Sequence, residues 1–352
     1  MRILTFAPQS NGVVSRQHSN PHSSPQFSGQ SQLPADTLTL RHATASNMAQ
    51  PKFAGKKDQE LHAAVEISDE VNIERLFKSG VDLNRVNSQK LTPLLTAVKF
   101  NQPKAISQLI ALGTNYSQAD SKNAVPMHHA AAGNKIEAAR ALLEGGAAVD
   151  PDSEWGTPMQ CAALNGHTDM VNMLAKEFKG NVNFPSQYNG YTPLHAAAHK
   201  GHYKTAEALL ALGALRTNKS TEDILPFQLA AAGGHTDLVR LLAQGVDVDQ
   251  RIRKKDMTTN SALLAAAEGG HDDTVRVLVK ELDADIDQEY YGNTALHYAS
   301  GKGHTSTVKT LLELGANANL PNGKGKTAYK IAKNGEIKQL LKQAMEKDAS
   351  SK

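Results

Sequence analysis

Short runs of alanine and leucine, separated by glycine and polar residues, recur along most of the chain. The clearest run opens at Thr192 and Pro193 and continues through three alanines to Gly201, and a second run with paired leucines covers Ala206–Ala214. Threonine is a preferred N-cap, proline is tolerated at the first helical position, and glycine accepts the left-handed conformation that ends a helix. The pattern therefore predicts two short helices, the first ending at Gly201 and the second stopping at Gly213.

The same pattern repeats with a period of about 33 residues. Self-similarity at a fixed period of this length is the signature of stacked structural repeats, in which each unit buries its apolar face against its neighbours. On this spacing the chain holds about nine units. They open at Gln59, Thr92, Val125, Thr157, Thr192, Leu225, Ser261, Thr294 and Thr327.

The end of the first helix is marked in the same way in most units. Asn101 and Asn134 stand where other units have glycine, and asparagine is the next best residue for the left-handed conformation. Polar turns such as Asp247–Asp249 follow the second helices. Gly-His pairs lie at 166–167, 201–202, 234–235, 270–271 and 303–304.

These motifs in phase, with Thr-Pro-Leu-His at 192–195 as the fullest copy, resemble the ankyrin repeat family over residues 58–342. The resemblance implies an all-α solenoid of antiparallel helix pairs with projecting β-hairpin-like turns. It also implies binding of another protein on a concave face, through the turn tips and the two positions before each Gly-His. We assign residues 56–345 to the array, with a tail at 346–352.

The two terminal units depart from the pattern. The unit at Gln59 lacks the Thr-Pro pair, and the unit near Lys324–Leu341 lacks the Gly-His pair and is rich in lysine. A repeat array needs terminal units with a polar outer face, so both are expected to be caps. Two linking turns are long, at Phe184–Tyr191 and at Gln250–Asn260.

Composition narrows the class of partner. The net charge is only +3 for 352 residues, without the focused basic face that nucleic-acid binding requires. The lone Cys161 indicates a reducing compartment, so we expect a cytoplasmic protein, with the nucleus as a further location. Because no apolar run approaches about 18 residues, no membrane span is expected. We expect a monomer on its own.

Residues 1–55 are rich in serine, glutamine, asparagine, histidine and proline. Such a segment cannot bury enough apolar surface to offset the entropy of ordering, so we interpret it as disordered. The alternative is a transit peptide for a mitochondrion or plastid, because the segment is serine-rich and Asp36 is its one acidic residue. In that case the chain is an organelle-imported interaction factor.

The 14 histidines raise the question of a metal site. One set, including His195, fills the fourth position of the opening motif, and the other fills the Gly-His position. The family resemblance implies that the first set bonds to threonine and backbone, and that the second bridges neighbouring units. Ligands for one ion must cluster, whereas these residues are spread one per unit. We expect no metal and no cofactor.

Two further features could suggest catalysis. Gly325, Lys326 and Thr327 match the end of a phosphate-binding loop, but Leu320 stands where that loop needs its first glycine. Cys161 lies in a predicted helix without a visible base or orienting group, so we interpret it as a packed small hydrophobe. The sequence therefore predicts no enzyme.

Residues that the repeat does not explain are the candidates for binding. Aromatic residues just before the openers are expected on turn tips, and exposed aromatics are preferred interface anchors. The alternative is that they pack on the next tip and stiffen the row. These residues are Trp155, Tyr188, Tyr191, Tyr290 and Tyr291.

The positions before Gly-His add Leu164, which is apolar without an evident core role, and the polar His199 and Lys200. Together with Trp155 and the tyrosines at 188 and 191, they predict a partner site centred on units four and five.

Arg251 and Arg253, in the second long turn, are candidates for contact with an acidic partner or for nuclear import, although a solvated basic loop is the simpler interpretation. The function predicted from sequence is a non-enzymatic adaptor or scaffold that binds a partner protein. The alternative is an inhibitory or regulatory subunit that covers a partner enzyme.

Overall fold

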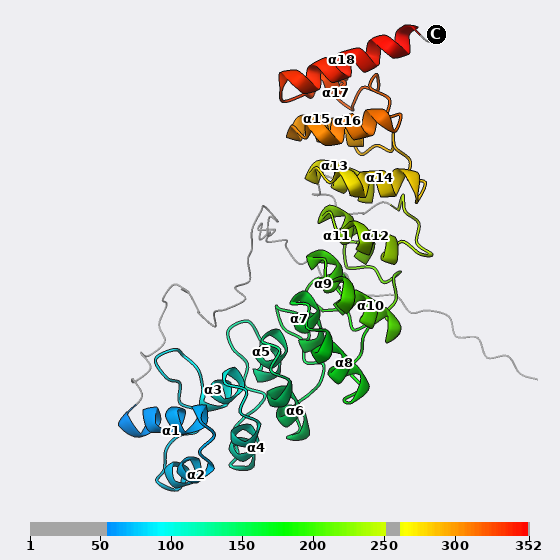
Figure 1. Ribbon diagram of the computed structural model, residues 1–352. Coiled ribbons are helices and arrows are strands. Elements are labelled where there is room, and N and C mark those ends of the chain that lie inside the picture. Colours follow the sequence, from blue (N-terminus) through cyan, green and yellow to red (C-terminus); the bar gives the residue numbers. More distant parts are fainter. Residues whose placement is uncertain (1–54, 251–260, 351–352) are drawn as a thin grey trace, which may run out of the picture. The chain divides into compact units, whose positions relative to one another are not determined.

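A computed structural model describes residues 55–250 and 261–350. Within these ranges the secondary structure is helical, arranged as nine successive helix pairs, and β-pairing is limited to two isolated bridges, at Tyr290 with Asn293 and at Pro321 with Thr327 (Figure 1). The all-α repeat architecture predicted from the sequence is confirmed. The first helices of the pairs are α1 (Lys56–Glu66), α3 (Pro93–Lys99), α5 (Pro126–Ala132), α7 (Pro158–Leu164), α9 (Pro193–Lys200), α11 (Pro226–Ala232), α13 (Ala262–Gly269), α15 (Ala295–Lys302) and α17 (Ala328–Ile331).

The second helices are on average longer and carry most of the large aliphatic residues of the core. Each packs against its own first helix and against the second helices of the adjacent units. They are α2 (Glu70–Lys78), α4 (Pro103–Ala111), α6 (Ile136–Glu144), α8 (Thr168–Lys176), α10 (Tyr203–Ala211), α12 (Thr236–Leu242), α14 (Asp272–Lys280), α16 (Thr305–Glu313) and α18 (Gly335–Ser350).

The capping residues set the helix boundaries as the sequence predicts. Helix α9 begins with Thr192 as N-cap and Pro193 at the first helical position, and it ends at Gly201 in the left-handed conformation, with φ of 76°. Asn101 and Asn134, the predicted substitutes for glycine, also have positive φ, at 54° and 52°. Asparagine tolerates this region better than other side chains.

The core lies between the two helix layers. The first helices contribute alanines, such as the fully buried Ala197 and Ala198, and the second helices contribute leucines, such as Leu209. Small side chains let the first helices approach closely, and each first helix packs against those of the units before and after it. Stability is therefore built from contacts within units and between neighbours.

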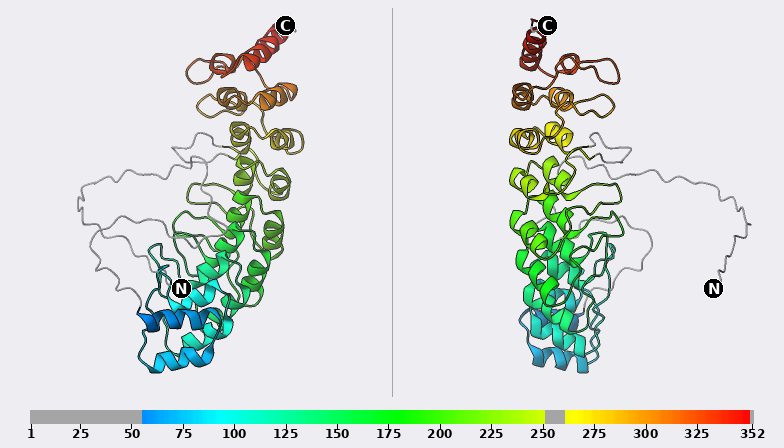
Figure 2. Two further views of the ribbon diagram at one scale, coloured as in Figure 1. Left: turned by 60° about the vertical axis from the view of Figure 1, so that its left-hand side comes forward. Right: turned by 90° about the vertical axis from the view of Figure 1, so that its right-hand side faces the viewer.

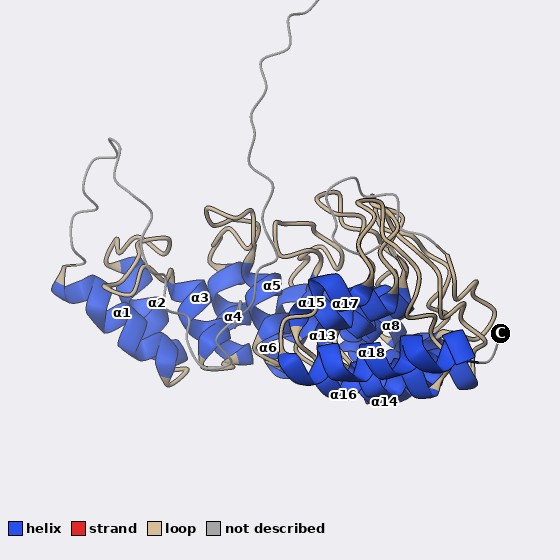
Figure 3. Ribbon diagram, turned by 90° about the horizontal axis from the view of Figure 1, so that it is seen from above, coloured by secondary structure: helices blue, strands red, loops and turns tan. Residues whose placement is uncertain are grey.

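Within the described residues, the loops that lead into the first helices project to one side of the helix pairs (Figures 2 and 3). We call these loops fingers. In Figure 3 the row of first helices lies next to the fingers and the second helices lie on the far side. The fingers and first helices thus share one face, and the second helices form the opposite, outer face.

Helix α1 begins where the array was assigned to start, whereas α18 extends beyond the assigned end. Helix α1 begins at Lys56, with Gly55 as N-cap and the Asp58 carboxylate accepting from the Gly55 N–H, so Gln59 lies inside the helix. Helix α18 continues through Ser350, beyond residue 345, where the sequence places the end of the array. Buried Ile337 and Leu341 anchor it on the preceding unit.

Several sequence-based interpretations concern residues outside the described ranges. They are the disordered or transit segment up to residue 54, and the basic residues Arg251 and Arg253 of the second long turn. Among the helices that the structure does describe, none is both long and apolar enough to cross a bilayer.

Candidate functional site

The histidines of the opening motif are internal parts of each unit. His195 Nδ1 accepts from the Thr192 N–H at 3.1 Å, and its Nε2–H donates to the Ile224 carbonyl, at 2.9 Å, in the next finger. Burial lowers the pKa of His195 to about 4, which keeps the imidazole neutral. His297 makes the same contacts with Thr294 and with the carbonyl of Lys326. His195 and His297 thus make the contacts with threonine and backbone that the family resemblance implied, whereas His128 follows Val125 and its Nε2 has no hydrogen-bond partner among the described residues.

The histidines of the Gly-His pairs link one unit to the next. Each donates from Nε2 to a backbone carbonyl near the end of the preceding first helix. In His235 the ring also lies against Gly201, where an added Cβ would be 2.5 Å from the imidazole. The bonds run from His167 to Ala132, His202 to Leu164, His235 to His199, His271 to Ala232 and His304 to Glu268, at 2.9 to 3.3 Å.

The geometry gives no sign of metal or nucleophile chemistry in the described residues. No group of three or more His, Cys, Asp or Glu residues there is arranged to hold a metal ion. Cys161 is buried, and burial raises the pKa of its thiol to about 12. A thiol needs its thiolate form to act as a nucleophile, so Cys161 acts as a packed side chain.

Trp155 and Tyr191 are half-buried, as Tyr290 is. Trp155 packs on the core and meets the His129 ring edge-on, with centroids 5.0 Å apart. Tyr191 stacks on His195 at 5.2 Å, and burial raises its pKa to about 12. These contacts agree with the alternative interpretation of the sequence, in which such residues stiffen the row of fingers.

Tyr188 and Tyr291 are the exposed aromatic candidates. Tyr188 is 47% exposed, and its hydroxyl accepts from the Asn123 side chain, in an earlier finger, at 3.4 Å. Tyr291 is 70% exposed and lies 4.4 Å from the ring of Tyr290, which is half-buried. These two side chains therefore have the exposure that an interface anchor needs.

The residues before the Gly-His pairs lie at the ends of the first helices. Leu164, the last residue of α7, is half-buried and packs on the core, which corrects the expectation that it has no core role. His199 is half-buried in α9, and burial lowers its pKa. Lys200 is exposed.

The structure places the residues of the predicted patch in two separate rows. In the finger row, the Asp152 carboxylate accepts from the Gln187 N–H at 2.7 Å, which places the fingers of Trp155 and Tyr188 side by side. In the helix row, Leu164 and His199 both accept from histidines of the following units. The rows lie at opposite ends of α7 and α9, about 10–12 Å apart for helices of seven and eight residues.

Sequence reasoning missed two residues of the helix row. Ile67 and Phe100 occupy the position that Lys200 has in unit five, and they are 74% and 44% exposed. The Lys99 ammonium lies 5.5 Å from the centre of the Phe100 ring. Counting eight residues from each opener would have identified both, but the first unit lacks the motif that draws attention to this position.

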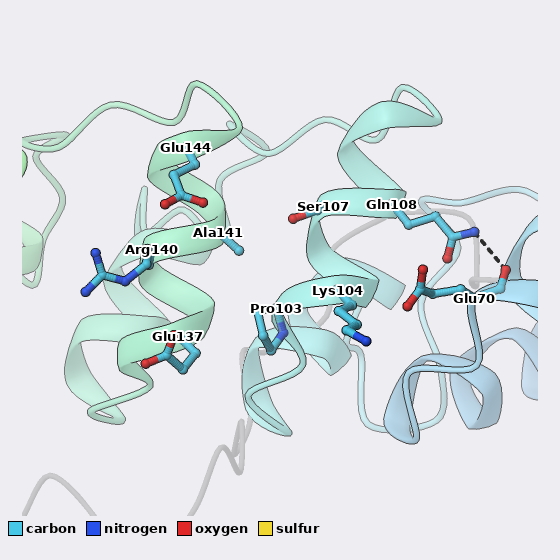
Figure 4. Close-up of a pocket in the computed structure, with 9 residues that line it drawn as sticks. All are labelled: Glu70, Pro103, Lys104, Ser107, Gln108, Glu137, Arg140, Ala141 and Glu144. Carbon is cyan, nitrogen blue, oxygen red and sulfur yellow. Dashed lines mark hydrogen bonds between the residues drawn. The ribbon is translucent and has the colours of Figure 1, made fainter.

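Many charges of the outer face are paired with each other. Ion pairs join successive second helices, among them Arg240 with Glu281 and Arg276 with Glu313. A cleft of about 560 Å³ lies between α2, α4 and α6, and Gln108 bridges part of it by donating to the Glu70 carbonyl (Figure 4). Its lining residues are Glu70, Pro103, Lys104, Ser107, Gln108, Glu137, Arg140, Ala141 and Glu144.

Comparison with known proteins finds ankyrin repeats along the array. The family described as ankyrin repeats (3 copies) matches residues 61–154, 146–223, 227–322 and 283–351. The crystal structure of the human ASB11 ankyrin repeat domain covers 72% of this chain and 98% of its own, with 24% identity and a TM-score of 0.47.

Two curated relatives are much longer than the matched region. The ankyrin repeat protein nuc-2 of Neurospora crassa is 25% identical over 182 residues, which are 52% of this chain and 17% of that protein. The glycerophosphocholine phosphodiesterase gde1 of Schizosaccharomyces pombe is 34% identical over 104 residues, 29% of this chain and 9% of that protein. The chain thus spans less than a fifth of either relative. Ankyrin repeats are generally protein–protein interaction modules, and the matches across the array show that this chain belongs to the ankyrin repeat family.

Proposed function

We propose that the chain is a non-enzymatic adaptor or scaffold that binds a partner protein on the face formed by its fingers and first helices. The observation that carries the proposal is that this face is preformed and still has exposed side chains. Its fingers are joined by hydrogen bonds from unit to unit, as when Thr221 donates to the Asn189 carbonyl at 3.2 Å, while Tyr188 and Lys200 remain exposed on it.

A preformed face favours binding because little conformational entropy is lost on association. The exposed side chains supply contacts of two kinds, an aromatic anchor at Tyr188 and a charge at Lys200. The outer face is less suited to this role, because many of its charges, such as Arg140 and Glu177, are already paired with each other.

Affinity capture from a native extract tests the proposal. The structure directs the choice of variant away from Trp155 and Tyr191, whose truncation would also remove internal packing. We therefore compare wild type with Tyr188→Ala/Lys200→Ala. The partner is expected to be captured by wild type and lost, or reduced about tenfold, in the double variant, since an anchor residue contributes upwards of 1 kcal/mol.

The matched control is Tyr203→Ala/Lys204→Ala, which removes the same two side-chain types from the outer face at the start of α10. Capture by this control should equal that of wild type. If both double variants capture the same proteins as wild type, the proposed face is not the binding site. Assaying a captured enzyme with and without the chain then separates an adaptor from an inhibitory subunit.

A further inference from the structure

The last unit exposes lysines that the fold does not use. Glu336, the acidic residue at the start of α18, pairs with Lys309 of the preceding unit at 2.8 Å. None of the ion pairs found among the described residues involves the lysines of the last finger, of α17 or of the turn that follows it. These exposed residues are Lys324, Lys326, Lys330 and Lys333.

The lysines are continuous with the finger of Tyr291. The Gly323 N–H donates to the Tyr291 carbonyl at 3.1 Å, and the Asn322 side chain donates to that of Asn293 at 2.9 Å. At the other end of the unit, the Lys333 N–H donates to the Ser300 carbonyl at 3.1 Å. The last two units therefore present their tyrosine and lysine residues on one connected surface.

Tyr291 occupies a backbone position that suits a smaller residue. It forms a two-residue turn with Gly292, closed by paired hydrogen bonds between Tyr290 and Asn293, and both central φ angles are positive, at 51° and 73°. Asparagine is a favoured residue at the first position of such a turn, whereas a bulky residue there is strained. The 70% exposure of Tyr291 shows that core packing does not offset this strain.

We propose that Tyr291, Lys324, Lys326, Lys330 and Lys333 form a docking surface for an acidic segment of a partner protein. We call it the basic tyrosine surface. The lysines attract carboxylates, and the exposed ring packs against the apolar part of the segment. This inference rests on the proposed function and adds a second contact region, with a defined chemistry, at the end of the face.

The neighbouring charges favour a narrow acidic segment over a broad anionic surface. Glu289 is exposed next to the tyrosine pair, and Asp285 and Asp287 lie in the same finger. A membrane or a nucleic acid duplex laid on this end would meet those carboxylates as well as the lysines, and like charges repel. An extended peptide can follow the lysines of the last unit and place only its apolar residue on Tyr291.

Fluorescence anisotropy on the full chain tests the proposal. The probe is a fluorescein-labelled peptide of aspartate and glutamate with a central leucine. Lys326→Gln/Lys330→Gln should weaken its binding about tenfold, because two charge contacts are lost. The control Lys104→Gln/Lys122→Gln removes two exposed lysines from the other end of the array and should leave binding unchanged. Equal weakening by both pairs, or no binding by wild type, would overturn the proposal.

Tyr291→Asn supplies a second readout, in which stability and binding change in opposite directions. The variant should raise the Tm, because asparagine suits the turn, and should weaken peptide binding several-fold. Unchanged binding would show that the ring is not an anchor. Binding of phosphatidylserine vesicles, but not of the peptide, would assign the surface to a membrane instead. Loss of capture in Tyr188→Ala/Lys200→Ala is independent of these outcomes, so the proposed function can hold when this inference fails.

Discussion

At the residue scale, the side chain at the fourth position of the opening motif makes the same two hydrogen bonds whether it is histidine or glutamine. Gln160 accepts from the Thr157 N–H at 2.8 Å and donates to the Phe184 carbonyl at 3.0 Å, in the pattern of His195 with Thr192 and Ile224. The amide and the imidazole have similar reach, but only the imidazole titrates. The array therefore contains its own isosteric replacement for a buried histidine.

His195→Gln should make stability less dependent on pH. The pKa of His195 is lowered to about 4 in the folded chain, from an ordinary value of 6.5, so between these values the unfolded chain binds the proton more tightly. Stability from His195 is thus present above about pH 6.5 and is lost as the pH falls towards 4, by up to about 2 kcal/mol between pH 7 and 5.

Urea unfolding at pH 7 and pH 5 measures this difference. Wild type should lose more stability than His195→Gln on acidification, and the reverse exchange Gln160→His should increase the loss. If all three chains lose the same stability, the neutral imidazole does not contribute to the pH dependence.

At the element scale, the glycine that follows first helices such as α9 has two structural roles. Gly201 ends α9 with a positive φ, and its Cα faces the ring of His235 from the next unit. Gly213, after α10, has a positive φ of 93°, but a Cβ built there would meet no atom within 4 Å. The two positions therefore separate the cost of backbone strain from the cost of a steric clash.

Gly201→Ala should destabilise the chain more than Gly213→Ala. Both substitutions put a Cβ on a left-handed residue, which costs about 1–2 kcal/mol. At Gly201 the Cβ must also displace His235 and with it the bond to the His199 carbonyl, at a further cost of about 1 kcal/mol. Thermal unfolding of the two variants checks the order, and equal Tm values would show that the His235 contact adds nothing.

At the scale of the whole molecule, the main contacts of each helix lie within its own unit and with adjacent units. In such an array stability is close to a sum of unit terms and nearest-neighbour terms. A defect in one unit should therefore loosen its neighbours before distant units respond.

Phe227→Ala tests this locality in unit six, where the ring is fully buried. The substitution should cost about 3–5 kcal/mol through lost burial and the cavity it leaves. Hydrogen exchange should then rise first in α9 to α14 and last in α1 to α4. A uniform rise along the whole array would contradict the nearest-neighbour description.

The sequence alone determined the family architecture, the helix ends and the structural role of the histidines. Each depends on local chemistry that repeats in phase: a threonine cap, a proline at the first turn, a left-handed glycine or asparagine. The C-terminal end of the array was placed less accurately, because apolar residues of α18, such as Ile337 and Leu341, replace the repeat motif there.

Only the tertiary structure decided which aromatic residues are exposed. Four aromatic residues occupy similar places before their openers: Trp155, Tyr188, Tyr191 and Tyr291. Trp155 packs on His129 and Tyr191 packs on His195, both from first helices, whereas Tyr291 projects from a strained turn. Exposure depends on how neighbouring units pack side chains that are distant in sequence. A periodic pattern identifies the face, but the contacts across units determine which of its side chains remain free to meet a partner.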